Sequence, residues 1–333
     1  MTGTVTLGHG SGGKLMAEMI HDLIGTILGI DPGQMDDSAL VSLPSAKIAF
    51  TTDSYTITPI FFPGGDIGSL AVNGTVNDLA VLGARPLLLS LALILEEGLE
   101  IKVLERVLQS IRGATDAVGV RVVTGDTKVV GRGNADKIFI NTSGIGVMEG
   151  DPPRREISPG DRVLINGPIG DHGIAIMAER SQLSFTRGLS SDCAPLSRLI
   201  RSVLDRCPND VKFMRDATRG GVASVLNEIV ASRSFGVVLR EERLPVREEV
   251  RGVCDILGID PLYAANEGKV VMIVQARAVP EVLEAMRGHP QGAAACEIGE
   301  VTAANPGMVS IETRVGGQRL LPLLLEEQLP RIC

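Results

Sequence analysis

Apolar residues in the first 150 positions follow two different periods, one typical of amphipathic helices and one typical of strands. The helical period is found over residues 14–28, 66–82 and 101–118. Short β-like runs are found over residues 1–7, 39–43, 47–51, 87–95, 120–124 and 137–148. We expect the runs 39–43 and 47–51, which are separated by Pro44-Ser45, to form a hairpin.

The second half of the chain again mixes both periods after a segment rich in proline, residues 149–161. Strands are predicted over residues 162–166, 235–240, 269–275, 296–301 and 308–312. Helices are predicted over residues 171–179, 194–205, 221–232, 247–257 and 279–287. These strands are too dispersed for a simple alternating βαβ chain, so the pattern predicts an α+β fold.

The length of 333 residues favours two domains, each with its own core. We place the first domain at residues 1–150 and the second at 155–325. The apolar run Leu320–Leu325 anchors a tail, residues 326–333, that we expect to be flexible. Eight extended residues reach about 25 Å, enough to carry the chain end into a distant cleft.

Composition excludes several classes of protein. A net charge of −8, 3% aromatic residues and no Trp argue against a nucleic-acid or anionic membrane surface. No apolar stretch reaches the roughly 18 residues of a membrane span, and residues 1–7 show no signal sequence. The five cysteines are widely spaced and the four histidines form no pair, which indicates reduced thiols in a cytoplasm and no zinc site.

The glycine-rich stretch Gly8 to Lys14 satisfies the spacing of a dinucleotide-binding loop and nearly that of a phosphate-binding P-loop. The P-loop pattern fails at Leu15, where a hydroxyl should bind Mg²⁺. The dinucleotide pattern lacks a strong preceding strand and a suitable acidic residue. Backbone amides and a lysine at a helix start still favour an anion site, and a mobile glycine loop is the alternative.

Carboxylates stand where the predicted elements end, each beside small or polar residues. They are Asp36, Asp37, Asp53, Asp78, Asp126 and Asp216. Any one of them could be a helix cap or a turn residue. If several converge, they would repel one another unless cations held them, and Mg²⁺ with a nucleotide polyphosphate is the natural partner.

The chain ends at Cys333, whose sulfur has only one neighbouring residue. Pro330 favours an extended tail, and Arg331 favours the thiolate while the terminal carboxylate opposes it. The position excludes prenylation, which needs a cysteine four residues from the end. On these residues alone, an unimportant exposed cysteine competes with a reactive thiol.

The order of the motifs resembles the aminoimidazole ribonucleotide synthetase (PurM-like) superfamily, which includes selenophosphate synthetase and thiamine monophosphate kinase. The motifs are Asp36-Asp37, Thr51-Thr52-Asp53-Ser54, Asn77-Asp78-Leu79-Ala80, Gly125-Asp126-Thr127 and Asp216-Ala217-Thr218-Arg219-Gly220-Gly221. Within it, His9-Gly10-Ser11-Gly12-Gly13, Gly125-Asp126-Thr127-Lys128 and the terminal Pro330-Arg331-Ile332-Cys333 are similar to the HypE family of hydrogenase maturation factors.

The resemblance implies a carbamoyl dehydratase that works on its own terminal thiol. Cys333 would accept a carbamoyl group from the carbamoyltransferase HypF. ATP would phosphorylate the thiocarboxamide oxygen, and loss of phosphate would leave a thiocyanate. The cyanide would pass to iron on a HypC–HypD complex, for the active site of a [NiFe]-hydrogenase.

The resemblance also implies roles for individual residues. Cys333, Lys128 and Glu267 would be catalytic, with Glu267 removing the amide protons. ATP would be held by Gly10, Ser11, Gly12, Gly13, Lys14, Asp53, Asn77, Asp126, Thr127, Thr218 and Arg219. Mg²⁺ would be bound by Asp36, Asp37, Asp53, Asp78, Asp126 and Asp216, and which of Asp36 and Asp37 contributes is left open. A strand-end salt bridge for Lys128 and a turn carboxylate for Glu267 are the alternatives.

In this superfamily the first domains pair through β-strands to form a homodimer, and ATP binds near their interface. The first domain here would therefore bind ATP and Mg²⁺ and form the dimer. A related ATP-dependent small-molecule kinase or synthetase is the main rival, since it would not need Cys333. A selenophosphate synthetase is disfavoured because no cysteine precedes residue 193. A non-catalytic adaptor, whose tail only binds partners, is the second rival.

Overall fold

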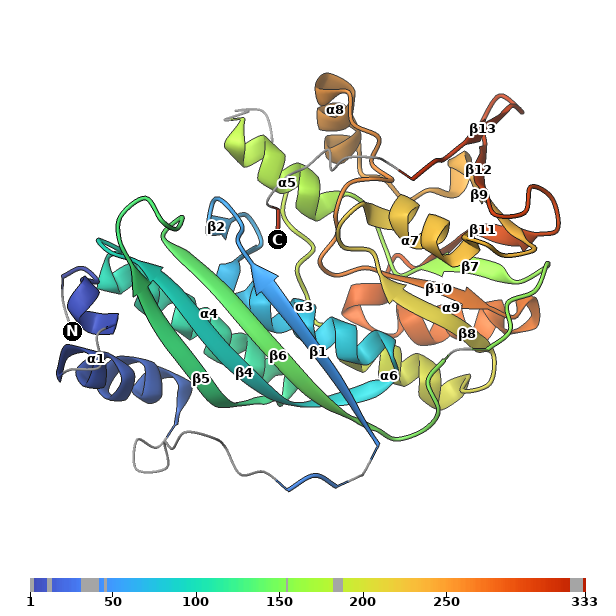
Figure 1. Cartoon of the computed structure of the whole chain (residues 1–333). Coiled ribbons are helices and arrows are strands. Elements are labelled where there is room, and N and C mark those ends of the chain that lie inside the picture. The colour runs from blue at the N-terminus through green and yellow to red at the C-terminus, as the bar shows by residue number, and fades with distance from the viewer. Residues whose placement is uncertain are drawn as a thin grey trace.

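The computed structural model describes residues 3–10, 14–30, 42–44, 47–153, 155–181, 188–323 and 332–333. It has two α+β halves, each built around its own main sheet (Figure 1). No helix within these ranges is long and apolar enough to span a membrane.

A four-stranded sheet, in the order β1-β6-β4-β5, organises the first half of the chain. Its strands are β1 (Ile48–Tyr55), β4 (Ala84–Glu96), β5 (Arg121–Val130) and β6 (Ile138–Met148). β6 is antiparallel to β1 and β4, and β4 is parallel to β5. Helices α3 (Ile67–Val81) and α4 (Ile101–Val118) cover one face of this sheet, and the other face is open (Figure 1).

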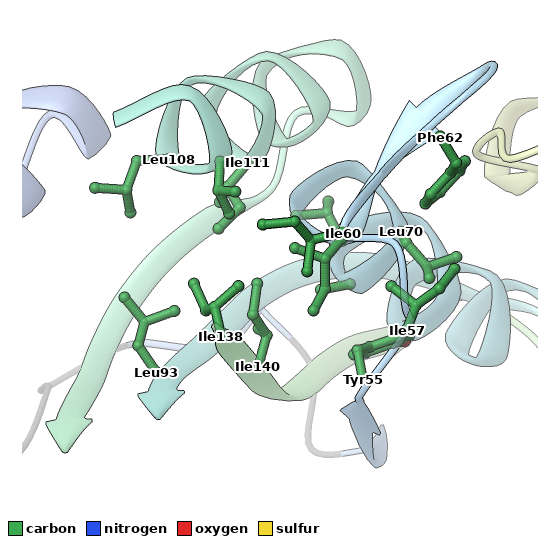
Figure 2. Packing of buried hydrophobic residues seen from close by; sticks show 14 of the residues in the cluster. Tyr55, Ile57, Ile60, Phe62, Leu70, Leu93, Leu108, Ile111, Ile138 and Ile140 are labelled. Carbon is green, nitrogen blue, oxygen red and sulfur yellow. The ribbon is translucent and has the colours of Figure 1, made fainter. Parts of the chain in front are cut away.

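The core of this half fills the layer between the sheet and its two helices. Alternating strand residues such as Leu93, Ile138 and Ile140 meet Leu108 and Ile111 of α4 there (Figure 2). The short strands β2 (Phe61–Phe62) and β3 (Gly65–Asp66) lead into α3. The predicted helix 101–118 is confirmed at both ends because its apolar residues form one stripe that the sheet buries.

A seven-stranded sheet, in the order β13-β12-β9-β11-β7-β10-β8, organises the second half. Its strands are β7 (Arg162–Ile165), β8 (Val211–Asp216), β9 (Gly236–Arg240), β10 (Val270–Val274), β11 (Cys296–Thr302), β12 (Val309–Glu312) and β13 (Gln318–Leu320). Its helices are α5 (Asp171–Arg180), α6 (Ser197–Arg206), α7 (Gly221–Val230), α8 (Glu248–Leu257) and α9 (Val279–Arg287). Among the described strands of this sheet, β9 and β12 are the one parallel pair, and the α+β prediction is confirmed.

Helix α3 lies at the junction of the two halves and contacts both β8 and α6. The Asp66 side chain caps its first turn by accepting from Gly68 N and Ser69 N, while Ser69 Oγ accepts from Asp66 N. Small residues dominate the helix and nearly all of it is buried. The helix is therefore packed on several sides, which fixes the residues at its carboxyl end against the second half.

One predicted element is wrong and one is untested. Residues 3–7 form no strand: an isolated bridge joins Thr4 to Glu100, and Leu7–Gly10 is a 3₁₀ turn. The expected hairpin over 39–51 stays a prediction, since residues 39–41 and 45–46 lie outside the described ranges; β1 pairs with β6. The helix predicted over 14–28 is confirmed, with a π-helical segment, Met19–Gly25, between α1 (Lys14–Glu18) and α2 (Thr26–Leu28).

Candidate active site

Three of the predicted aspartates meet at the junction of the two halves. Asp53 comes from β1, Asp78 from the last turn of α3, and Asp216 from the end of β8. Asp53 Oδ2 accepts a 3.0 Å hydrogen bond from Thr75 Oγ1, and Asp78 Oδ2 accepts a 2.7 Å bond from Thr51 Oγ1. Both carboxylates are thus oriented by hydroxyls of the same two elements, β1 and α3.

The three carboxyl groups raise one another's proton affinity. Burial, followed by the charge of Asp78, raises the pKa of Asp53 to about 6. Burial and then Asp78 raise the pKa of Asp216 to about 7. Burial also raises the pKa of Asp78, while its bond from Thr51 opposes the shift. The cluster therefore holds negative charge that this chain alone does not neutralise, which favours a bound cation.

Glu267 lies beside this cluster in the turn before β10. Its side chain is almost fully buried, and burial, followed by the charge of Asp192, raises its pKa well above its usual range. Asp216, Asp53 and Asp78 raise it further. A buried carboxyl with a raised pKa suits proton abstraction near neutral pH.

The neighbouring segment 192–194 holds the backbone at Glu267. The carboxylate of Asp192 accepts from the backbone amides of Glu267 and Gly268, at 3.1 and 3.2 Å. Burial would raise the pKa of Asp192, but its 2.8 Å ion pair with Lys269 keeps that pKa below its usual value. A Cβ on Gly268 would overlap the backbone oxygen of Asp192, so only glycine permits this close approach.

The chain end lies against Thr56, the first residue after β1. The amide of Thr56 donates a 3.1 Å hydrogen bond to the backbone oxygen of Cys333. The Ile332 side chain is 2% exposed and packs within an apolar cluster to which both halves contribute. Thr56 is three residues beyond Asp53, about 10 Å along an extended chain. The terminal thiol therefore belongs to the same region as the carboxylate cluster.

Two predicted site residues, Asp126 and Lys128, lie elsewhere. Both are exposed on the open face of the sheet, where Asp126 lines up with Ala92, Asn141 and Ser54 across the four strands. Three strand spacings, about 14 Å, separate β5 from β1, and Asp53 points to the opposite face. Within one chain, Asp126 and Lys128 do not join the cluster.

The remaining predicted residues are distributed as follows. Asn77 ties the halves together, since its side chain bonds to Leu196 N, Ala194 O and Glu267 O, and the nucleotide contact predicted for it stays a prediction. Thr127 is buried on the helix side of β5. Thr218 and Arg219 form the turn after β8, and the charge of Arg219 acts on Asp53.

The glycine-rich segment is described only in part. Gly10 ends the first 3₁₀ turn and Lys14 begins α1. Ser11, Gly12, Gly13, Asp36 and Asp37 lie outside the described residues.

Sequence reasoning missed His172, Ser191, Asp192 and Thr56, which contact the chain end or Glu267. His172 was set aside because it has no metal-ligand partner in the sequence. The one available signal is Gly170-Asp171-His172-Gly173 at a helix start. That motif does not reveal that the partner of His172 is the backbone carbonyl of Ile332.

The carboxylates fit a magnesium nucleotide better than a bare metal. Within the described ranges, no three His, Cys, Asp or Glu side chains are close enough to hold a metal by themselves. Mg²⁺ usually takes only one or two carboxylates, the rest of its shell being phosphate and water oxygens. Asp53, Asp78 and Asp216 are suited to that arrangement because they are neighbouring carboxylates whose pKa values burial raises, and a bound cation would favour their charged forms.

Comparison with known proteins agrees with this architecture. Residues 35–148 match the family described as AIR synthase related protein, N-terminal domain, and residues 158–311 match its C-terminal domain. The fold is thus that of a two-domain AIR synthase related protein.

More specific relatives cover the whole chain. The carbamoyl dehydratase HypE of Rhodobacter capsulatus is 49% identical over 99% of this chain and 98% of its own length. A HypE crystal structure in complex with ATP matches 99% of this chain and 100% of its own, with a TM-score of 0.94 and 47% identity. The HypE chain of a HypE–HypF complex matches 94% of this chain and 100% of its own, with a TM-score of 0.80 and 44% identity. The chain belongs to the HypE family of carbamoyl dehydratases.

Proposed function

We propose that this protein is an ATP-dependent carbamoyl dehydratase of hydrogenase maturation, and that its substrate is a carbamoyl group on its own Cys333. The observation that carries the proposal is the bound chain end. The Cys333 backbone is held at Thr56, immediately after the strand that contributes Asp53. ATP is the expected phosphate donor because a relative 47% identical was crystallised with it.

The reaction converts Cys333–S–C(=O)NH₂ and ATP into Cys333–S–C≡N, ADP and phosphate. The amide oxygen takes the γ-phosphoryl group, which turns a poor leaving group into a good one. The nitrogen loses two protons as the C–O bond breaks and the C≡N bond forms. Proton removal and phosphate stabilisation are therefore the two tasks of the site.

The residues of this chain divide these tasks. Glu267 accepts a proton from the amide nitrogen, and its raised pKa matches that role. Asp53, Asp78 and Asp216, with Asp36, Asp37 or both, would hold a magnesium-bound polyphosphate, and Mg²⁺ would supply charge neutralisation there. Gly10 to Lys14, Thr218 and Arg219 would complete the phosphate contacts. The first domain, 1–150, carries most of this site, the domain 155–325 contributes Asp216 and Glu267, and the tail, 326–333, delivers the thiol.

Asp126 and Lys128 would reach the nucleotide from a second copy of the chain. The open sheet face carries Ile48, Phe50 and Ile94, which are 43%, 67% and 40% exposed. Apolar side chains of this size on an otherwise polar face favour a homodimer through that face. Lys128 of one subunit would then stabilise the phosphoryl group bound by Asp53 and Asp78 of the other.

Mixed dimers test this arrangement. Asp78→Asn and Lys128→Met chains, each inactive alone, should recover about a quarter of wild-type turnover in an equal mixture. Half of the random dimers are mixed, and each of these has one intact site. No recovery in mixtures that size-exclusion chromatography shows to be dimeric would place both residues in the same chain's site.

The proposed partners follow from the chemistry of the thiol. Cys333 must receive its carbamoyl group from a carbamoyltransferase, and a relative was crystallised with HypF. A HypC–HypD complex is the proposed acceptor of the cyanide, and the cytoplasm is the proposed compartment. Since one thiol serves both a donor on another protein and ATP in this chain, the chain end must leave Thr56 and return.

Intact-mass spectrometry tests the function. The protein is incubated with ATP, Mg²⁺, carbamoyl phosphate and the purified carbamoyltransferase, with Cys333→Ala as the control. A gain of one carbamoyl group minus water in the wild type alone is expected. ATP consumption without this adduct, and equally in Cys333→Ala, would refute the proposal and favour a small-molecule kinase.

A further inference from the structure

His172 lies in the first turn of α5, is fully buried, and contacts the chain end directly. Its Nε2 lies 2.6 Å from the backbone oxygen of Ile332, and its Nδ1 lies 2.8 Å from Ser191 Oγ. A carbonyl oxygen can only accept, so Nε2 carries the hydrogen. In a neutral imidazole Nδ1 is then an acceptor, and the Ser191 hydroxyl donates to it. The serine thereby fixes the tautomer that binds the tail.

The surroundings keep this imidazole neutral and in place. Burial lowers the pKa of His172, although its bond to Ile332 opposes the shift. The ring packs edge-on against Phe62, with centroids 5.5 Å apart and planes at 86°. A histidine held on two sides and unable to gain charge easily is a stable donor for a backbone carbonyl.

Ser191 is itself held by the segment that positions Glu267. Its amide donates to Pro63 O at 2.8 Å, and its hydroxyl oxygen accepts from Cys193 N at 3.0 Å. Asp192, the residue between these two contacts, binds the amides of Glu267 and Gly268. The same three residues, 191–193, therefore connect the contact to the tail with the proposed base.

We propose that His172 and Ser191 form a positioning pair that holds the chain end in the dehydration site. The inference rests on the proposed function and adds residues to it. His172 binds the carbonyl of Ile332, one residue before the reacting thiol, so the pair acts through the position of the chain end. The other contacts of the chain end include the bond from Thr56 N to Cys333 O and the packing of the buried Ile332 side chain. Thr56 belongs to the first half of the molecule and His172 to the second, so the chain end is bound by both.

Three measured rates distinguish a loss of tail positioning from a loss of folding. Full-length protein is assayed for carbamoylation of Cys333 by the carbamoyltransferase, for single-turnover dehydration after ATP is added, and for alkylation of Cys333 by iodoacetamide, read from the terminal peptide. Carbamoylation and alkylation need the chain end released, and dehydration needs it bound. His172→Ala leaves the Ile332 carbonyl without its donor, so dehydration should slow about ten- to a hundredfold.

The other two rates should respond differently in His172→Ala. Carbamoylation should be at least as fast as in the wild type, and alkylation should be faster. His172→Gln, which retains an N–H donor, should recover part of the dehydration rate. Ser191→Ala, which only frees the tautomer, should have a smaller effect. His289→Ala, at a half-buried histidine in the 3₁₀ turn after α9, serves as the control.

Several results would overturn the inference. These are unchanged dehydration in His172→Ala, an equal loss of carbamoylation and dehydration, or a His172→Gln variant no better than His172→Ala. Failure of the proposed function is distinguishable, because a wild type that never dehydrates Cys333 still reports tail binding through its alkylation rate. Equal alkylation of wild type and His172→Ala would reject the positioning pair whatever the function is.

Discussion

Replacing Asp78 by Asn should abolish catalysis and at the same time stabilise the ligand-free protein. Burial is the largest cause of the raised pKa values of Asp53 and Asp216, and the charge of Asp78 is the second. The substitution keeps the shape of the side chain and an acceptor for Thr51 Oγ1. It removes one negative charge from a cluster whose carboxylates repel one another when no cation is bound.

The magnitude follows from the Asp216 carboxyl. Its pKa rises from 3.8 to about 7, a difference that corresponds to about 4 kcal/mol. Burial is the larger cause of this rise, so removing the Asp78 charge should recover less than half of that free energy, about 1–2 kcal/mol. The attraction between Asp78 and Arg215, which the substitution also removes, reduces the gain.

The sign depends on pH. A carboxyl whose pKa is raised in the folded state contributes its full stability below the unfolded value, and loses that contribution as pH rises through the folded value. For Asp216 this window runs from 3.8 to about 7. At pH 5 Asp216 is mostly neutral, so Asp78→Asn should gain little there, whereas at pH 8 the gain should be complete.

Urea unfolding at pH 5 and pH 8, without Mg²⁺ or nucleotide, measures this difference. Asp255→Asn is the matched control, because that carboxylate is exposed on α8 and lies outside the open sheet face. A stabilisation of Asp78→Asn that is the same at both pH values, or a destabilisation at pH 8, would refute the electrostatic account. An equal gain in Asp255→Asn would attribute the effect to net charge.

Three further variants test other parts of the site. Glu267→Gln should slow single-turnover dehydration by about 10²–10⁴-fold with nucleotide affinity retained, and dehydration near the wild-type rate would exclude Glu267 as the base. Gly268→Ala should lower the free energy of unfolding by about 1–3 kcal/mol and slow dehydration, because its Cβ overlaps Asp192 O; wild-type stability would show that the turn yields. Phe50→Glu should give a folded monomer in light scattering, and a persistent dimer would exclude the open sheet face as the interface.

Much of the architecture could be predicted from local patterns. Helix α4 was predicted at its observed ends because its apolar stripe has one partner, the sheet. Strand β8 was missed, although it carries Asp216, because its sequence Val211-Lys212-Phe213-Met214-Arg215-Asp216 alternates imperfectly and is buried at only two positions. Its pairing with β10 is a long-range contact that no window of the sequence contains.

The sequence was enough to predict the candidate site residues, but not which of them lie close together. Asp53, Asp78 and Asp216 were found because carboxylates beside small residues at element ends are unusual, and the structure brings all three together. Asp126 was grouped with them, yet strand order places it at the far edge and on the other face. Strand order is a property of the whole sheet, so no local spacing could have separated them.

The junction combines two opposite kinds of polar contact, and their combination explains why a stable fold keeps a repulsive cluster. Asn77 satisfies three backbone groups of the second half at 2.7–3.4 Å, and within that half Lys269 neutralises Asp192. The Asn77 contacts hold the halves together without any ligand. Asp53, Asp78 and Asp216 therefore need not contribute to that attachment, and their charge is left for a cation and its phosphate. Because Asn77 and Asp78 are adjacent on α3, the carboxyl end of one helix both joins the two halves and supplies a negative charge to the site between them.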